Sequence, residues 1–239
     1  PTFWPWVERS QADVICLQET KANPEQLTEP LLNPPGYAGY FSSSIRKKGY
    51  SGVAVYSKKE PLEVTKELPE ERFATEGRTL HLEYPELHLL NIYFPNGQKD
   101  EDRLDYKMAF YQSFLDQALY LRKTKPVVVC GDFNTAHQPI DLAYPEMYHH
   151  TSGFLEIERN FLSLMIKKGF IDTFRRLNGD LAGQYTWWSY RHGERERNEG
   201  WRIDYFFVSQ ELEGKLTKAW IEPHVAGSDH CPIGIELAL

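Results

Sequence analysis

The most constraining feature of this chain is an apolar run that ends in a polar turn. Val127–Cys130 is a short run rich in β-branched residues, and the tetrapeptide GDFN, residues 131–134, follows it directly. This pattern predicts a buried strand that delivers a carboxylate and a carboxamide at its carboxyl end. Ligands bind at that edge in open α/β sheets. Asp132 and Asn134 also favour turns through local hydrogen bonds, so the tetrapeptide alone leaves a purely structural turn open.

The composition indicates a folded, acidic protein. The 239 residues are 41% hydrophobic and 14% aromatic, which allows a sizeable core and argues against disorder. The formal net charge of −7 counts against a protein that holds DNA by bulk charge alone, although carboxylates at a metal site would raise the acidic count. No apolar stretch approaches the ~20 residues of a membrane span, and no secretory signal is visible, so we expect an intracellular protein.

The order of strand and helix patterns predicts a layered α/β domain. Helical patterns cover Arg103–Arg122 and Leu155–Lys168. Several strand signals lie too close together for crossover helices, which favours a sandwich of two packed mixed sheets flanked by helices. No linker or repeat divides the chain, so residues 1–239 are expected to form a single domain. The strand signals are Val14–Leu17, Gly52–Tyr56, Leu80–Glu83, Leu87–Phe94, Val127–Cys130, Ile203–Val208 and Ile233–Leu237.

Polar residues occur at the ends of several predicted strands. Acidic side chains with a histidine can bind Mg²⁺, position a water molecule and offset charge on phosphorus. Each has a structural alternative: Glu19 could favour a helix amino terminus, Asp204 could pair with Arg202, and His230 could be a satisfied core histidine. These alternatives would have to hold at every strand end at once, which favours phosphodiester hydrolysis. The residues are Glu19, Tyr93, Asn96, Asp132, Asn134, Asp204, Asp229 and His230.

The motifs, in this order, resemble a known family. LQETK, GYSGV, YFPNG, GDFN, WRIDYF and GSDHCPI follow one another as in the exonuclease III family of apurinic/apyrimidinic endonucleases, within the endonuclease/exonuclease/phosphatase superfamily. The resemblance spans the chain from about Ala12 to Leu239. GDFN and SDH are shared across the superfamily, whereas LQETK, GYSGV and WRIDYF point to its DNA-repair branch. The family fold, a four-layer α-β-β-α sandwich, agrees with the layered prediction.

The resemblance implies a Mg²⁺-dependent hydrolase, an AP endonuclease of the exodeoxyribonuclease III type. Glu19 would ligate the ion, with Asp229 near it. Mn²⁺ could substitute, because both ions accept carboxylate oxygens. The full set of implied metal-site residues is Glu19, Asp132, Asn134, Asp229 and His230.

Catalytic roles follow from the same resemblance. Asp132 would orient or deprotonate the attacking water, helped by Asn134. His230, held by Asp204, would contact the scissile phosphate and offset its growing negative charge. Tyr93 would hydrogen-bond the phosphate or the leaving oxygen. In-line attack would leave a 3′-hydroxyl and a 5′-phosphorylated end.

Recognition of an abasic site would use an apolar pocket into which the family flips the damaged sugar. Trp187, Trp201 and Ile203 occupy the matching positions, with ordinary aromatic core as the alternative. We favour core for the neighbouring Trp188.

A polar loop is the second implied recognition element. Residues 191–200 resemble the family's loop that lies against DNA, with Arg191 a candidate groove contact, and a solvated loop is the alternative. Tyr50, Lys99 and Arg103 match positions that approach DNA, and Lys21 lies close enough to Glu19 to touch the metal-site network. The implied substrate-binding residues are Lys21, Tyr50, Asn96, Lys99, Arg103, Trp187, Arg191, Trp201 and Ile203.

The resulting prediction is a DNA-repair phosphodiesterase that cleaves duplex DNA 5′ to abasic sites, with 3′-to-5′ exonuclease or 3′-phosphodiesterase activity. Its partner would be duplex DNA with abasic sites or 3′-blocked ends. We expect a monomer without a membrane partner, in the cytoplasm or nucleoid of a prokaryote or the nucleus of a eukaryote.

Two alternatives to this function stay open. One is a superfamily phosphoesterase that acts on RNA, nucleotides, inositol phosphates or phospholipids, which WRIDYF and the aromatic pocket disfavour. The other is a catalytically weak DNA-damage-binding homologue. The retained acidic and histidine groups disfavour it, because burying charges without a use for them is costly.

The amino terminus departs from the family pattern. The family begins with a strand that ends in an Asn-x-Asn/Asp-Gly turn, and Pro1 falls inside or just before the helix that follows this strand. We therefore expect roughly 15–20 further amino-terminal residues in the natural protein, enough for one strand and a turn.

Overall fold

The structure is a computed structural model that describes residues 3–191 and 193–239. The chain divides into two compact units, which are described here one at a time. Unit 1 contains residues 1–93 and 113–131, and unit 2 contains residues 94–112 and 132–239. No helix within the described ranges is long and apolar enough to cross a membrane.

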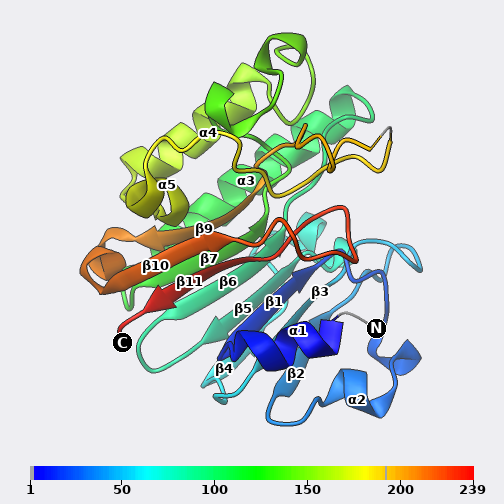
Figure 1. The fold of residues 1–239 in the computed structure, drawn as a ribbon. Coiled ribbons are helices and arrows are strands. Elements are labelled where there is room, and N and C mark those ends of the chain that lie inside the picture. The colour runs from blue at the N-terminus through cyan, green and yellow to red at the C-terminus, as the bar shows by residue number, and fades with distance from the viewer. Residues whose placement is uncertain (1–2, 192) are drawn as a thin grey trace. The chain divides into compact units, whose positions relative to one another are not determined.

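The first sheet of unit 1 is antiparallel and has three strands in the order β1-β3-β2. Its strands are β1 (Val14–Gln18), β2 (Ala38–Ser42) and β3 (Val53–Ser57). β3 is buried along its whole length, which explains why its sequence is continuously apolar rather than alternating. Helix α1 (Phe3–Ser10) lies across this sheet in Figure 1, and its Val7 packs with Ile15 and Tyr56.

The other strands of unit 1 follow one another in the order β4-β5-β6-β7. They are β4 (Glu63–Thr65), β5 (Thr79–Glu83), β6 (His88–Tyr93) and β7 (Val127–Asp132), whose last residue belongs to unit 2. Gly131 has φ 143°, and a Cβ atom there would lie 1.8 Å from the carbonyl oxygen of Ile92. The glycine of GDFN is therefore required by the close approach of β6 and β7.

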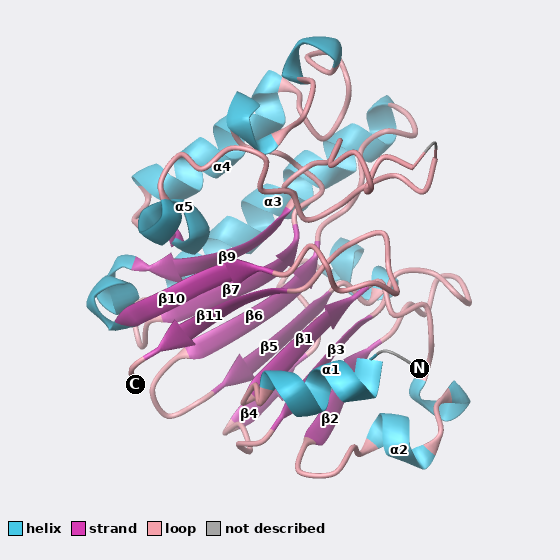
Figure 2. Ribbon diagram, in the orientation of Figure 1, coloured by secondary structure: helices cyan, strands magenta, loops and turns pink. Residues whose placement is uncertain are grey.

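Unit 2 contains two antiparallel strand pairs and the helices that pack on them. β8 (Phe170–Asp172) pairs with β9 (Asp204–Ser209), and β10 (Leu216–Ile221) pairs with β11 (Ile233–Leu237). Helix α4 (Glu156–Lys167) lies against β8, and α5 (Thr173–Asn178) lies against β9 and β10. Long loops, pink in Figure 2, lead into β9 and β11 and carry six of the candidate site residues, Trp187, Arg191, Trp201, Ile203, Asp229 and His230.

Both predicted helices and every predicted strand are present, with ends displaced by no more than two residues. The predicted helix 103–122 is α3 (Glu101–Leu121), which begins in unit 2 and ends in unit 1. Strands β2, β4, β8 and β10 and the short helices α2 (Glu29–Leu32) and α5 were not predicted. The remaining helical turns are 3₁₀ segments at Pro24–Gln26, Glu71–Glu76, Pro139–Asp141, Pro145–Met147 and Gln210–Lys215.

Candidate active site

The turn after β7 fixes the orientation of the Asp132 carboxylate. Asn134 stands in the left-handed region with φ 51°, so its backbone N–H and its side chain both face Asp132. The backbone N–H donates to Asp132 Oδ1 at 2.7 Å, and Asn134 Nδ2 donates to Asp132 Oδ2 at 3.0 Å. Asn96 Nδ2 donates to Asn134 Oδ1 at 3.1 Å. The structure thus brings together three of the predicted site residues, Asn96, Asp132 and Asn134.

A buried ion pair supports this turn. Lys107 Nζ donates to Asn134 O at 2.8 Å, to Thr135 Oγ1 at 2.9 Å and to Glu158 Oε1 at 2.5 Å. The Lys107 and Glu158 side chains are both 0% exposed. The sequence analysis missed this pair, although Lys107 lies four residues before Tyr111 on the apolar face of the predicted helix 103–122. A lysine in an apolar stripe was the signal that a buried partner existed.

His230 and Asp204 form the second part of the candidate site. His230 Nδ1 contacts Asp204 Oδ2 at 2.9 Å, and the two side chains are 24% and 9% exposed. Burial lowers the pKa of His230, but the nearby carboxylates of Asp204, Asp132 and Asp229 outweigh it and raise the pKa to about 10. The imidazole is therefore a cation at neutral pH, with one N–H directed to Asp204.

The pKa of the Asp132 carboxyl group is raised above its usual value. Burial and the charge of Asp204 raise its pKa to about 7, against the opposing effects of His230, the Asn134 N–H and Lys107. A carboxyl group with a pKa near the operating pH can accept and release a proton during a reaction. The pKa of Asp132 thus lies near neutrality and that of His230 well above it. This difference is expected if Asp132 acts as a base and His230 as a cation that stabilises negative charge.

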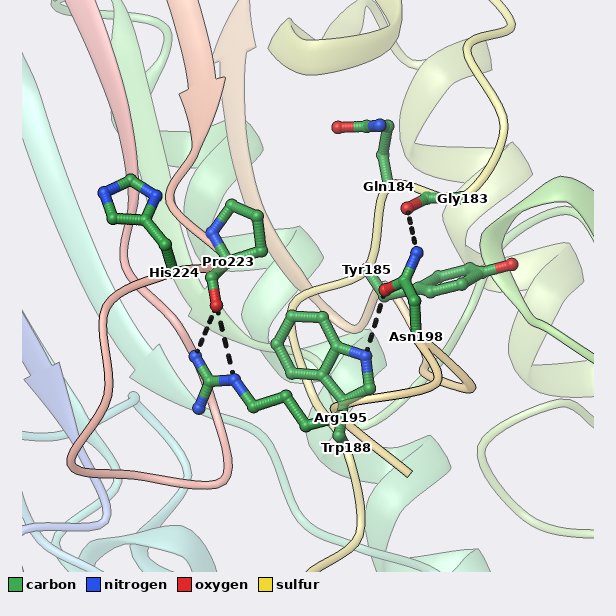
Figure 3. A pocket seen from close by; sticks show the side chains of 8 residues that line it. All are labelled: Gly183, Gln184, Tyr185, Trp188, Arg195, Asn198, Pro223 and His224. Carbon is green, nitrogen blue, oxygen red and sulfur yellow. Dashed lines mark hydrogen bonds between the residues drawn. The ribbon is translucent and has the colours of Figure 1, made fainter. Parts of the chain in front are cut away.

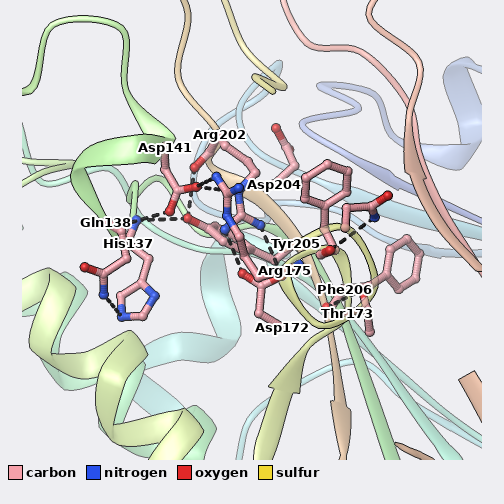
Figure 4. Close-up of polar contacts among 12 residues, drawn as sticks. His137, Gln138, Asp141, Asp172, Thr173, Arg175, Arg202, Asp204, Tyr205 and Phe206 are labelled. Atoms are coloured by element: carbon pink, nitrogen blue, oxygen red, sulfur yellow. Dashed lines mark hydrogen bonds and ion pairs between the residues drawn. The ribbon is translucent and has the colours of Figure 1, made fainter. Parts of the chain in front are cut away.

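Arg202 does not pair with Asp204, although the two are close in sequence. Its Nε lies 2.8 Å from Asp141 Oδ1, and its Nη2 lies 2.7 Å from Asp172 Oδ2. The Arg202 side chain is 1% exposed, and its guanidinium lies 4.5 Å from the centroid of the Tyr205 ring. Figure 4 shows this network beside Asp204. The alternative that Asp204 pairs with Arg202 is therefore wrong. The Asp204 carboxylate instead pairs with His230.

The aromatic residues of the predicted pocket share one apolar cluster. Trp187 and Trp201 are half-buried, pack against the buried Ile203, and have edge-to-face rings with centroids 6.3 Å apart. Trp187 Nε1 also donates to Asp229 Oδ2 at 3.1 Å, which connects the cluster to the acidic residue. Trp188 is 2% exposed, as predicted for a core residue. The abasic pocket itself stays a prediction.

In unit 1, Glu19 and Lys21 lie together after β1. Lys21 Nζ is 3.0 Å from Glu19 Oε1, with both side chains partly exposed. Glu19, Lys21 and Ser51 have φ values of 54°, 53° and 52°, and the two segments are joined by Lys21 N donating to Ser51 O at 2.8 Å. Left-handed non-glycine residues cost energy and gather at functional sites, so this strand end is a candidate functional edge.

Arg78 connects two predicted site residues that the sequence analysis treated separately. Its Nη2 donates to Tyr50 Oη and its Nη1 to the carbonyl oxygen of Tyr93, each at 2.9 Å. Its Nε lies 2.6 Å from Glu76 Oε2, and the side chains of this pair are 2% and 1% exposed. The guanidinium also lies 4.7 Å from the centroid of the Tyr93 ring. Arg78 precedes a predicted strand and gave no other sequence signal.

The remaining predicted DNA-contacting residues make local contacts. Lys99 pairs with Asp100 at 3.1 Å, and the Arg103 guanidinium lies 4.5 Å from the Tyr106 ring centroid. The backbone N–H of Arg191 donates to Ser189 Oγ at 3.1 Å. The predicted DNA-side loop, 191–200, includes position 192, which lies outside the described residues.

The donors available for a metal ion are carboxylate oxygens. Among the described residues, no group of three or more acidic, histidine or cysteine side chains could hold a metal ion. Mg²⁺ commonly uses only one or two carboxylates and completes its shell with water and phosphate oxygens. Glu19, 38% exposed, and the partly exposed Asp229 are hard donors of this kind. Each is a candidate ligand in its own unit, and the ligand set stays a prediction.

Comparisons with known proteins agree with these observations. Residues 3–230 match the Endonuclease/Exonuclease/phosphatase family model. An exodeoxyribonuclease of Bacillus subtilis is 43% identical over 231 residues, 97% of this chain and 90% of the relative. DNA repair nuclease APEX1 of Danio rerio is 40% identical over 235 residues, 98% of this chain and 76% of the relative.

Solved structures share the fold. An AP endonuclease from Archaeoglobus fulgidus matches with a TM-score of 0.88 at 29% identity, covering 98% of this chain and 92% of that one. The 3′ phosphatase NExo from Neisseria, bound to a product DNA hairpin, matches with a TM-score of 0.90 at 25% identity, covering 99% and 94%. The predicted fold class, an α/β sandwich of mixed sheets with flanking helices, is confirmed by this likeness.

Proposed function

Because this chain belongs to the endonuclease/exonuclease/phosphatase family, we propose that it is a DNA-repair nuclease that cleaves duplex DNA on the 5′ side of abasic sites. The products are a 3′-hydroxyl and a 5′-phosphorylated end. The relatives named exodeoxyribonuclease and DNA repair nuclease support this reaction. The exodeoxyribonuclease and the 3′ phosphatase also support 3′-to-5′ exonuclease or 3′-phosphodiesterase activity at blocked ends.

The observation that carries the proposal is that unit 2 contains two titratable groups with different chemical roles, one as a base and one as a cation. Asp132, with a pKa raised to about 7, has both carboxylate oxygens bonded to Asn134. His230, with a pKa raised to about 10, is bonded to Asp204. A poised carboxylate and a fixed imidazolium are what water attack on a phosphodiester requires.

In the reaction, Asp132 accepts a proton from the attacking water, and Asn134 holds the carboxylate in one orientation. His230 donates an N–H to a phosphoryl oxygen and offsets the negative charge that develops there, while Asp204 keeps the imidazole charged and oriented. Tyr93 hydrogen-bonds the phosphate or the leaving 3′-oxygen, and its segment is held by Arg78. Water supplies the oxygen of the new phosphate end, and the leaving oxygen takes up a proton from solvent to become the 3′-hydroxyl.

Mg²⁺ is the proposed cofactor, with Mn²⁺ as a substitute, and it supplies positive charge that polarises the phosphate. Glu19 is the candidate ligand in unit 1. In unit 2 the candidate is Asp229, whose Oδ2 accepts from Trp187 Nε1 and whose Oδ1 accepts from Ser228 Oγ at 3.3 Å. These bonds orient the carboxylate and still leave lone pairs on each oxygen.

Substrate recognition follows from the aromatic cluster and the polar side chains around it. Trp187, Trp201 and Ile203 form the apolar surface that accepts a sugar lacking its base. A nucleotide that keeps its base is excluded by size. The proposed DNA contacts come from Lys21, Tyr50, Asn96, Lys99, Arg103 and Arg191, and the proposed active form is a monomer on duplex DNA.

The test is incision of an end-labelled duplex that carries one abasic analogue. With Mg²⁺ we expect a cut on the 5′ side of the lesion, and with EDTA we expect none. The matched control duplex carries a normal nucleotide at the same position and should stay intact. Equal or faster hydrolysis of RNA, nucleotides or inositol phosphates, or undiminished DNA binding without any cleavage, would overturn the proposed function.

A further inference from the structure

Arg195 is bonded to a second loop rather than turned to solvent. Its Nη1 donates to the carbonyl oxygen of Ser228 at 2.7 Å, and its Nη2 donates to those of Pro223 at 2.9 Å and Val225 at 2.6 Å. Its Nε also donates to Pro223 O at 3.3 Å. Figure 3 shows the guanidinium facing Pro223 at the edge of a cavity of about 400 Å³. One side chain from the loop 191–200 therefore binds the backbone of residues 223–228.

The segment that Arg195 binds leads directly to the candidate catalytic residues. It belongs to the connection between β10 and β11, whose base is closed by Glu222 N donating to Pro232 O at 2.9 Å. Ser228 Oγ accepts from the backbone N–H of His230 at 3.1 Å and donates to Asp229 Oδ1 at 3.3 Å. The carbonyl held by Arg195 thus belongs to the residue that bonds both Asp229 and His230.

The side chain of Arg195 is itself supported by an aromatic residue. Its guanidinium lies 4.7 Å from the ring centroid of the buried Trp188, a cation–π contact. Trp188 Nε1 donates to Asn198 Oδ1 at 3.2 Å, and the backbone N–H of Trp188 donates to Asp229 O at 3.0 Å. Asn198 Nδ2 in turn donates to Gly183 O at 2.9 Å, so the arginine rests on a bonded aromatic support.

Arg197, two residues further along the same loop, has a different environment. It is 50% exposed and pairs with Glu199 on its own loop at 2.5 Å. Glu199 in turn accepts from Tyr144 Oη at 2.8 Å, so this ion pair bonds the loop to residue 144. Substitution of Arg197 therefore changes an arginine of this loop while the bonds between Arg195 and residues 223–228 stay in place.

We propose that Arg195 is a positioning residue that clamps the 223–228 segment and thereby sets Asp229 and His230 for phosphodiester cleavage; this proposal rests on the proposed nuclease function. The planar guanidinium has donors for several carbonyl oxygens at fixed angles, whereas a lysine ammonium is a point charge on a flexible stem. Arg195→Lys keeps the positive charge, but a lysine cannot donate to the three carbonyl oxygens in the same geometry. The clamp also joins the loop proposed to face DNA to the loop that handles the phosphate.

The experiment compares Arg195→Lys with Arg197→Lys and Arg176→Lys in Mg²⁺-dependent cleavage of the abasic duplex. Arg176 pairs with Glu213 on the exposed side of α5, so its variant controls for the chemical change itself. We expect Arg195→Lys to lower kcat about ten- to a hundredfold with KM changed less than about threefold, because misplacement of catalytic groups by about 1 Å costs this much. Equal kcat losses at Arg195 and Arg197, or an unchanged kcat for Arg195→Lys, would overturn the proposal.

Hydrogen exchange supplies a readout that needs neither DNA nor metal. Arg195→Lys should speed exchange in peptides covering residues 223–232, and Arg197→Lys should not. Unchanged exchange there would overturn the clamp even if activity fell. If Arg195→Lys did not fold, Ser228→Ala would decide, because it keeps the carbonyl but removes the link to Asp229 and His230 and should lower kcat. Failure of the wild type to cut the abasic duplex would refute the nuclease function alone.

Discussion

Removal of one partner from the buried Lys107–Glu158 pair should cause a large loss of stability. Lys107→Met keeps most of the side-chain volume but deletes the ammonium group that bonds Glu158, Asn134 O and Thr135. Both side chains of the pair are 0% exposed, so water cannot replace the lost contacts. The Glu158 carboxylate would then remain in a dry interior without its countercharge.

The magnitude follows from the hydrogen bonds that Glu158 keeps. Removing one partner of a buried pair typically costs about 3–5 kcal/mol. Glu158 still accepts from Ser152 Oγ at 2.7 Å and from the backbone nitrogens of Gly153 and Leu155 at 2.6 and 3.1 Å. These donors stabilise the lone carboxylate, so we expect the lower end, about 3 kcal/mol, or roughly a hundredfold in the ratio of folded to unfolded protein.

Urea unfolding followed by tryptophan fluorescence measures this difference in free energy. The matched control is the double variant Lys107→Met/Glu158→Gln, which removes both charges and should recover about half of the loss or more. A loss below about 1 kcal/mol for Lys107→Met would refute the reasoning, because a buried unpaired carboxylate cannot cost so little. A double variant no more stable than the single one would refute it as well.

Three further predictions concern catalysis, specificity and pH. Asp132→Asn should lower turnover about a thousandfold, since a positioned base contributes about 10²–10⁴-fold, with little change in melting temperature; a loss below about tenfold would exclude Asp132 as the base. Trp187→Ala should raise cleavage at normal nucleotides relative to abasic sites, measured on matched duplexes, and an unchanged ratio would remove Trp187 from the pocket. Burial, together with the neighbouring His88, lowers the pKa of His81 from 6.5 to about 4. Because the folded state disfavours protonated His81, stability should be full above about pH 6.5 and fall by up to about 3 kcal/mol as the pH drops toward 4. His81→Gln should flatten this dependence in thermal melts, and an equally steep profile for the variant would contradict the assignment.

Complete burial explains why two of the strands were readily predicted from the sequence. β3 and β7 are buried along their whole length, which produces the continuous apolar runs that mark a strand. The missed strands β4 and β8 have three residues each, and half of the residues of β10 are exposed, so neither length nor periodicity marks them. Edge strands are commonly short.

Sequence reasoning also predicted only some of the side chains of the candidate site. Asp132, Asn134, Asp204 and His230 were predicted because each belongs to a motif at a strand end. Arg195 was not singled out, because an arginine in a polar loop is indistinguishable in sequence from a solvated one. Its partners are backbone carbonyls about thirty residues away, which leave no pattern in residue types.

Buried ion pairs lie beside several candidate catalytic residues, and their position argues for a purpose beyond stability. Three predicted catalytic residues each neighbour a buried ion pair of their own unit, although such pairs are often no more stabilising than apolar residues of similar volume. A fold selected for stability alone would have little reason to keep several of them beside its strand ends. Lys107 and Arg78 hold the backbone carbonyls of Asn134 and Tyr93, which an apolar side chain cannot do with the same directionality. The pairs are Lys107–Glu158 under Asn134, Arg202 with Asp141 and Asp172 beside Asp204, and Arg78–Glu76 at Tyr93.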